Sequence, residues 1–205
     1  GLDYPRLRRS SPRLLYVSLS GYGASGPKSR LATHDLNVVG EAGLLSGGSS
    51  VPPGLPADTA ASLLTLVAIL AKLKDHGRST YRGGVIDLSI LDGALALISA
   101  PLVRTLVAPE RTHDELWGTH ACYRAYDCAD GGRITVGALE PQFWKAICDE
   151  LGFPQHTAAQ WSRRKQAGIT ADFERTFKAK SRDEWMAILG PLDACVAPVL
   201  TLQEM

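Results

Sequence analysis

The first half of the chain alternates two short apolar segments with two long helical ones, and this order constrains the fold most. Leu14–Leu19 and Gly83–Leu91 are β-rich and apolar enough to be buried strands. Between them, an Ala- and Leu-rich segment predicts a helix with Asp58 as its N-cap and Gly77 as its C-terminal stop. Another helical segment follows the second strand, and Pro101 is expected to kink or break it. Strand, helix, strand and helix in this order predict an α/β layer around a parallel sheet.

The pattern changes near Pro109. The β-rich segments 120–128 and 133–139 flank Ala129–Gly132, which predicts a hairpin with glycines in its turn. From Pro141 the chain becomes helical: one helix runs from Pro141 to Gly152, another starts at a capping box formed by Ser181 and Glu184, and a short strand follows at 195–199. We therefore expect a large α/β part at residues 1–108, a linker at 109–118 and a smaller α+β domain at 119–205.

Composition argues against several classes of function. Lys and Arg number 22 and Asp and Glu 21, a net charge of +1, which disfavours a nucleic-acid surface or a polybasic membrane anchor. The four cysteines have no metal-binding spacing, so no metal is expected, and their scatter suggests a reducing, cytoplasmic setting. The longest apolar run, Leu63–Ala71, is too short to span a bilayer, and no signal peptide is visible. The chain does not start with Met, and its first residues resemble the interior of a longer protein.

A G-x-G-x-x-G pattern, Gly21, Gly23 and Gly26, follows the first predicted strand. In a dinucleotide fingerprint the glycines open a helix whose N-terminus faces a pyrophosphate. Here Pro27 follows directly, and no strand leads into Glu41, which stands where a ribose-binding acid would be expected. The sequence therefore favours a mobile loop at residues 20–26 over a cradle for NAD or FAD.

Five motifs, in this order, resemble those of CoA-transferase family III, the CaiB/BaiF group. They are SLSGYGASGP, THDLN, GLLSGGSSVPPGLPADTAAS, GGVIDLSILDGALAL and GALEPQFW. Within the family the chain most resembles the α-methylacyl-CoA racemase branch. Members are considerably longer, so the resemblance implies the central part of such an enzyme: part of a Rossmann-like parallel-sheet domain followed by a smaller α+β domain.

The resemblance also assigns catalytic residues, each on its own motif. His34 matches the His-Asp motif of the racemase branch, Asp58 the family's catalytic aspartate, and Glu140 the acid that pairs with the histidine. Without the resemblance each has a plainer interpretation: Asp58 as a helix cap, His34 as a loop residue, and Glu140 as a first-turn acid. Val38 and the segment Thr59–Ala61 depart from the family's usual residues.

The glycine loop, with Gly21, Tyr22 and Gly23, is expected to lie beside the thioester of an acyl-CoA. Glycines there allow backbone conformations and close approaches that a β-carbon would prevent. The implied substrate is an acyl-CoA, with no cofactor beyond the coenzyme A that the substrate carries.

Three functions remain open at this stage. The first is racemisation at carbon 2 of a 2-methylacyl-CoA, with His34 and Asp58 as acid and base on opposite faces. The second is transfer of CoA between carboxylic acids, in which Asp58 forms a mixed anhydride. The third is a truncated chain without catalytic activity.

Family resemblance further implies an interlaced homodimer in the complete enzyme. Glu140 would then act across subunits, beyond hydrogen-bonding distance of its own chain's His34, and the predicted linker is polar and long enough to permit this. An apolar surface is expected to be exposed on this chain where further segments would pack.

Overall fold

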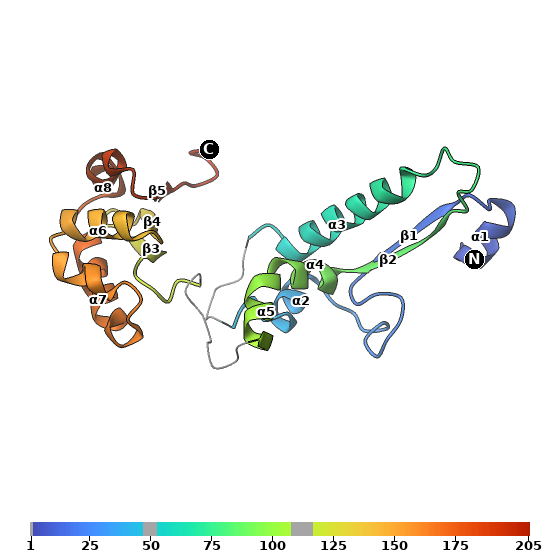
Figure 1. The fold of residues 1–205 in the computed structure, drawn as a ribbon, viewed down its shortest axis with the longest axis horizontal. Coiled ribbons are helices and arrows are strands. Elements are labelled where there is room, and N and C mark those ends of the chain that lie inside the picture. Colours follow the sequence, from blue (N-terminus) through green and yellow to red (C-terminus); the bar gives the residue numbers. More distant parts are fainter. Residues whose placement is uncertain (1, 47–52, 108–116) are drawn as a thin grey trace. The chain divides into compact units, whose positions relative to one another are not determined.

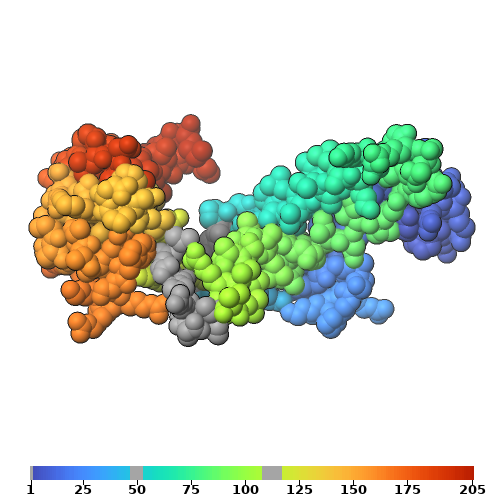
Figure 2. Space-filling view, in the orientation of Figure 1, coloured from blue at the N-terminus to red at the C-terminus, as the bar shows by residue number. Residues whose placement is uncertain are grey.

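The computed structural model describes residues 2–46, 53–107 and 117–205. The chain divides into two compact units, residues 1–112 and 113–205, and each is described by itself (Figures 1 and 2). Only the last two residues of the predicted linker, 109–118, are among those described.

Unit 1 is built around two parallel strands. Its elements, in chain order, are α1 (Tyr4–Ser10), β1 (Leu15–Ser20), α2 (Asp35–Glu41), α3 (Pro56–Leu73), β2 (Gly84–Ser89), α4 (Ile90–Leu97) and α5 (Ser99–Val107). β1 pairs with β2 from Leu15 opposite Gly84 to Ser20 opposite Ser89. The predicted parallel pairing is confirmed. Because both strands end at the same level, the segments that follow them, the glycine loop and α4, begin at one edge of the sheet.

Helix α3 runs alongside the strand pair (Figure 1) and packs tightly on α4. Small residues make this contact possible. Ala57 and Ala61 are buried on α3, and Gly93 is buried on α4. Ala57 also belongs to the small apolar core of unit 1, with Val38, Val39, Ala42 and Ala94.

The structure corrects two predicted ends of α3. The helix begins at Pro56, with Leu55 as its N-cap, so Asp58 is the third residue of the helix and not its cap. Proline is common at the first helical position, because its ring fixes φ near the helical value. An N–H group at that position would have no intrahelical partner, so its absence in proline costs nothing. The helix ends at Leu73, before Gly77.

The second helical segment breaks before Pro101, the residue predicted to cause the break. α4 ends at Leu97, and α5, bent by 70° from α4, begins at Ser99 and contains Pro101. Pro101 has no N–H for the Leu97 carbonyl, and its ring would clash with that carbonyl, so the helix stops one turn earlier.

Helix α3 is longer than its apolar run suggested. Its 18 residues have a mean hydropathy of 1.4, enough by length and composition alone to cross a membrane, and 17% of them are buried in the structure. The expectation of a segment too short to span a bilayer is therefore wrong for the helix as a whole, although core helices of soluble proteins meet the same criterion. Its exposed apolar side chains include Leu63, Leu66, Val67 and Leu70.

Unit 2 places one face of an antiparallel sheet against helices. Its elements are β3 (Tyr123–Asp127), β4 (Arg133–Gly137), α6 (Pro141–Glu150), the 3₁₀ helix η1 (Pro154–Ala159), α7 (Arg163–Phe177), α8 (Arg182–Leu189), the 3₁₀ helix η2 (Gly190–Leu192) and β5 (Val196–Val199). The sheet order is β3-β4-β5. The core is aromatic: Tyr126, Trp144, Phe173, Phe177 and Trp185 pack together, and Tyr126 and Phe177 lie 4.8 Å apart between ring centroids.

Most local predictions for unit 2 are confirmed. The hairpin turns through Gly131 at φ +79°, Pro141 opens α6, and Gly152 follows α6 in the left-handed region at φ +80°. Ser181 and Glu184 form the predicted capping box. Helix α7, which was not predicted as a separate element, buries Ile169 and two phenylalanines on one face.

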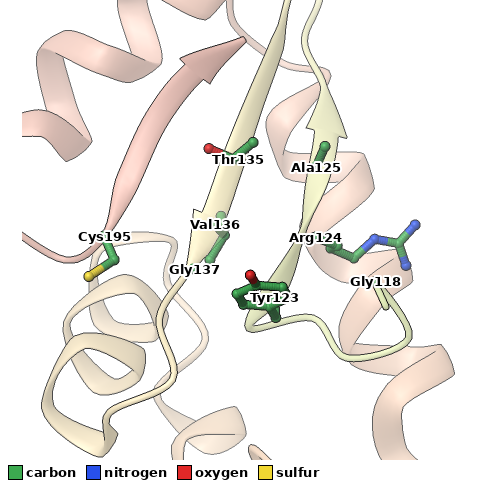
Figure 3. Close-up of a pocket in the computed structure, with 8 residues that line it drawn as sticks. All are labelled: Gly118, Tyr123, Arg124, Ala125, Thr135, Val136, Gly137 and Cys195. Atoms are coloured by element: carbon green, nitrogen blue, oxygen red, sulfur yellow. The ribbon is translucent and has the colours of Figure 1, made fainter. Parts of the chain in front are cut away.

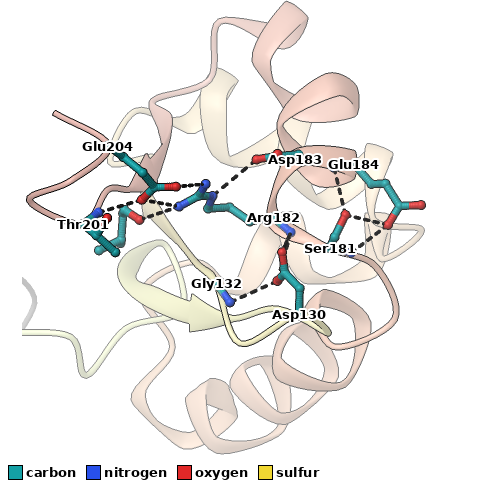
Figure 4. A network of polar contacts seen from close by, with 9 residues as sticks. Asp130, Gly132, Ser181, Arg182, Asp183, Glu184, Thr201 and Glu204 are labelled. Carbon is teal, nitrogen blue, oxygen red and sulfur yellow. Dashed lines mark hydrogen bonds and ion pairs between the residues drawn. The ribbon is translucent and has the colours of Figure 1, made fainter.

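A polar network fastens the last residues to the rest of unit 2 (Figure 4). The Arg182 backbone N–H donates to the Asp130 carboxylate, and its guanidinium donates to the Glu204 carboxylate and to the Val199 carbonyl oxygen. Glu204 in turn accepts the Thr201 backbone N–H at 2.7 Å. The hydrogen bonds from Arg182 hold the pKa of Glu204 down at about 2.

Candidate active site

Two glycine-loop residues contact the segment that leads into α2. A β-carbon on Gly21 would stand 2.2 Å from the Thr33 methyl group, so any other residue at position 21 would have to displace the Thr33 side chain. The Tyr22 hydroxyl lies 3.2 Å from the Thr33 hydroxyl and donates to the Glu41 carboxylate at 2.8 Å. The hydrogen bond from Lys28, followed by that from Tyr22, lowers the pKa of Glu41. The loop expected to be mobile is therefore tied to α2.

The strand β2 holds the same loop from a second direction. The Ala24 N–H donates to the Asp87 carboxylate, 3.0 Å from one oxygen and 3.3 Å from the other. Gly23 precedes it at φ +85°, which L residues rarely adopt. The loop conformation thus depends on Gly23 and on Asp87, a residue that the sequence did not single out.

The segment after the third glycine confirms that the G-x-G-x-x-G pattern has the wrong context for a dinucleotide. Residues 27–34 form turns and coil, and the next helix, α2, begins only at Asp35. No helix N-terminus follows Gly26 directly, as pyrophosphate binding in a Rossmann fingerprint requires.

His34 is the residue immediately before α2. Its backbone is extended, its carbonyl oxygen accepts the Asn37 N–H at 3.0 Å, and its own N–H donates to the Asn37 side chain at 3.1 Å. The imidazole is exposed. These backbone bonds fix the position of residue 34 at the start of α2.

Asp58 lies in the first turn of α3 and is joined to the start of α2. The Asp35 carboxylate, on a side chain that is 4% exposed, accepts the Asp58 backbone N–H at 2.8 Å. Because Asp35 directly follows His34, this bond brings the segments that carry His34 and Asp58 into one corner of unit 1. The side chain of Asp58 is half-buried, and its Oδ1 is fully buried with no hydrogen-bond partner among the described residues.

Glu140 belongs to unit 2, where it is the N-cap of α6. Its carbonyl oxygen accepts the Trp144 N–H at 3.0 Å, while its exposed side chain makes no capping hydrogen bond. The plainer interpretation of Glu140 as a first-turn acid is therefore not what the structure has: the residue stands one position before the helix.

Close to Glu140 in sequence, a pocket of about 360 Å³ opens on unit 2 (Figure 3). It is lined by Gly118, Tyr123, Arg124, Ala125, Thr135, Val136, Gly137 and Cys195. A β-carbon on Gly137 would contact both Tyr123 and Cys195, at 4.0 and 3.9 Å from their nearest side-chain atoms, so glycine keeps the space between them open. None of the predicted site residues lines this pocket.

Comparison with known proteins settles which family these motifs belong to. The sequence profile described as CoA-transferase family III matches residues 1–205. The chain belongs to CoA-transferase family III. It is 36% identical over 215 residues to the α-methylacyl-CoA racemase of Homo sapiens, with 97% of this chain and 54% of that protein covered.

Other family III members are also similar. The succinyl-CoA:glutarate CoA-transferase of Homo sapiens is 31% identical over 165 residues, covering 76% of this chain and 37% of that protein. The crystal structure of a CaiB/BaiF family protein from Brucella suis superimposes with a TM-score of 0.77 at 24% identity, over all of this chain and 57% of that one, and shows the shared fold. The chain thus spans about half the length of the relatives it matches.

Sequence reasoning about this family III chain missed Asp35 as a member of the site. In the sequence it is an acid in the first turn of a helix, where it would ordinarily complement the helix dipole from the surface. Asp35 is buried because α2 packs on α3, and the same packing brings it to the Asp58 N–H, 23 residues along the chain. The one available signal was its place beside His34 in the THDLN motif.

Proposed function

We propose that the protein is an acyl-CoA racemase, which inverts the configuration at carbon 2 of a 2-methylacyl-CoA by proton transfer. The observation that carries the proposal is the hydrogen bond from the Asp58 N–H to Asp35, the neighbour of His34. It supports a common site for one imidazole and one carboxylate, the two side chains that a two-base exchange requires. The 36% identity to a racemase supports the same choice.

In this reaction the thioester bond stays intact. A base on one face removes the carbon-2 proton, and the electron pair moves into the enolate, whose oxygen needs hydrogen-bond donors or a positive dipole. An acid on the other face then returns a proton to carbon 2. Asp58 supplies a carboxylate oxygen that has no hydrogen-bond partner among the described residues, and His34 supplies an imidazole, a group that can give or accept a proton.

Deuterium uptake tests the proposal. A stereodefined 2-methylacyl-CoA incubated with the protein in D₂O is expected to gain one deuterium at carbon 2 and to lose its stereochemical purity, with no acceptor acid present. His34→Ala and Asp58→Ala are expected to lower the rate at least about 100-fold, as loss of a general acid or base does. Uptake that persists unchanged in both variants rules out these roles.

The second candidate is CoA transfer between carboxylic acids, which the succinyl-CoA:glutarate CoA-transferase relative favours. The Asp58 carboxylate would attack the thioester carbonyl and expel CoA thiolate, forming a mixed anhydride. The thiolate would then attack the Asp58 carbonyl carbon of the anhydride, releasing the first acid as a carboxylate and leaving an Asp58–CoA thioester. A second carboxylate would attack this thioester, and the expelled CoA thiolate would attack the new acyl carbonyl, which frees Asp58. Hydroxylamine would trap an Asp58 adduct, and the rate would depend on a second acid. Racemisation predicts neither result.

A further inference from the structure

Helix α3 begins without a cap of its own. The first N–H groups of any helix lack intrahelical partners, and a Ser, Thr, Asp or Asn at the N-cap usually accepts one of them. The N-cap of α3 is Leu55, whose side chain has no acceptor, and Pro56 after it has no N–H. The Thr59 N–H already bonds the Leu55 carbonyl oxygen, so the N–H groups of Ala57 and Asp58 are left to find partners.

Asp35 supplies that missing acceptor from another helix. Its carboxylate accepts the Asp58 N–H at 2.8 Å, and only 4% of the residue is exposed. A hydrogen bond to an ionised acceptor is about twice as strong as one between neutral groups. The bond therefore fixes the first turn of α3 to the start of α2, as an N-cap side chain would fix it to the preceding residue.

Comparison with two other helices of the chain shows what this arrangement does for Asp58. Helices α4 and α8 also have an acid as their third residue, Asp92 and Glu184, and in both the acid bonds back to the serine at the N-cap. In α3 the third residue is Asp58, and its Oδ1 has no partner among the described residues. The carboxylate of the third helical residue thus has a serine hydrogen-bond donor in α4 and α8, whereas the Oδ1 atom of Asp58 in α3 has none among the described residues.

We propose that Asp35 is a positioning residue: it caps α3 in place of Leu55, holds the backbone of Asp58 and so leaves the Asp58 carboxylate free for chemistry. The reactive role of that carboxylate rests on the proposed function, whereas the capping role does not. Asp35 itself contacts neither substrate nor reacting atoms in this proposal.

Hydrogen exchange of the 205-residue chain tests the cap directly. The exchange rate of the Asp58 amide is compared with that of the Thr65 amide, further along α3. Asp35→Ala is expected to raise this ratio about tenfold, the value of one lost capping bond. Asp35→Asn keeps an acceptor oxygen and is expected to stay within about threefold of the natural protein.

Asp92→Ala is the matched control, because it removes the capping box of α4 in the same unit. It is expected to speed exchange across unit 1 while leaving the ratio of Asp58 to Thr65 unchanged. If Asp35→Ala does not fold, Asp35→Ser, whose hydroxyl is one bond too short, replaces it. An unchanged ratio in the Ala or Ser variant overturns the capping role.

Kinetics of carbon-2 deuterium exchange test the positioning role. Asp35→Ala is expected to lower kcat about tenfold or more with little change in KM, and Asp35→Asn to restore most of it. A kcat that falls equally in Asp92→Ala, per folded molecule, overturns positioning in favour of a general structural role. If the natural protein shows no carbon-2 exchange at all, the proposed function fails. The ratio of the Asp58 and Thr65 amide exchange rates still tests whether Asp35 caps α3.

Discussion

Gly93 of α4 lies so close to Ala57 of α3 that a β-carbon on Gly93 would stand 2.5 Å from the Ala57 carbonyl oxygen. It would stand equally close to the Ala61 backbone nitrogen. Replacing a helical glycine by alanine ordinarily stabilises a helix by about 0.5–1 kcal/mol. Backbone atoms cannot rotate away from a new methyl group, and overpacking costs about 1–3 kcal/mol. We therefore expect Gly93→Ala to destabilise unit 1 by about 1–2 kcal/mol.

The free energy of unfolding of each unit is measured by chemical denaturation, with hydrogen exchange of that unit's amides as the signal. Gly168→Ala in α7 is the control, because its β-carbon would meet no heavy atom of the described residues within 4 Å. It is expected to stabilise unit 2 by about 0.5–1 kcal/mol. Equal stabilisation by both substitutions contradicts the close contact between α3 and α4.

Asp58→Ala is expected to make the protein more stable while it removes activity. A buried acceptor without a hydrogen bond costs about 1–3 kcal/mol, and the Asp58 Oδ1 is such an acceptor. The favourable interaction of an acid with a helix N-terminus is smaller, about 0.3–1 kcal/mol. The difference predicts a gain of about 1 kcal/mol, seen as a higher urea midpoint, whereas Asp92→Ala should lose about 1 kcal/mol with its capping box. A lower midpoint for Asp58→Ala contradicts the reading of Asp58 as an unsatisfied group.

The C-terminal network of unit 2 is expected to open in acid. The pKa of Glu204 is lowered from 4.5 to about 2, so its contribution to stability is complete above about pH 4.5 and is lost as the pH falls through about 2. Exchange of the Thr201 and Glu204 backbone amides, expressed relative to the rate of an unstructured chain at the same pH, should therefore speed up across this window. Glu204→Gln should show the fast relative exchange already at neutral pH, while Glu150→Gln, at the end of α6, should behave like the natural protein. A relative rate at these two amides that does not rise in acid argues against the network in solution.

Cys195 is expected to be the one fast-reacting thiol. It is exposed, whereas Cys122, Cys128 and Cys148 are buried. Burial raises the pKa of Cys148 to about 12 and also raises that of Cys128, so both remain protonated at pH 8. Iodoacetamide followed by peptide mass spectrometry should show one modified cysteine in the native protein and four after denaturation. Native Cys195→Ser should show none, and rapid labelling of Cys148 would refute the burial argument.

The family resemblance leads to a prediction about Glu140. If it acts across subunits, mixing inactive His34→Ala and Glu140→Ala variants of the complete enzyme should restore part of the carbon-2 exchange, because some mixed dimers then hold one intact site. Subunit exchange is verified separately with differently labelled chains. Persistent inactivity after proven exchange places both residues in one subunit's site.

Pattern alone predicted the elements whose signals are local. The strands at β1 and β2 are short apolar segments, and the hairpin of β3 and β4 has its glycines where the turn requires them. The capping box of α8 and the proline of α6 also depend on neighbouring residues only. Such features follow from a few adjacent side chains and need no tertiary contact.

The misassigned features depend on contacts between distant segments. Asp58 looked like a cap because an acid before an apolar helix usually is one, yet Pro56 starts the helix earlier and Asp35 takes over the capping. Helix α7 was hidden because its buried stripe, with Ile169 and Phe173, is set among charged residues. The link between the segments that carry His34 and Asp58, made through Asp35, exists only after α2 has packed on α3.

Among the described residues, β1 and β2 pair only with each other, so each strand has an outer edge of unpaired backbone groups. Beside them α3 exposes a row of leucines. Open strand edges invite pairing with other chains, and exposed apolar helices are what chaperones and proteases bind. Unit 1 therefore offers two surfaces, a strand edge and an apolar helix face, on which another polypeptide segment can pack.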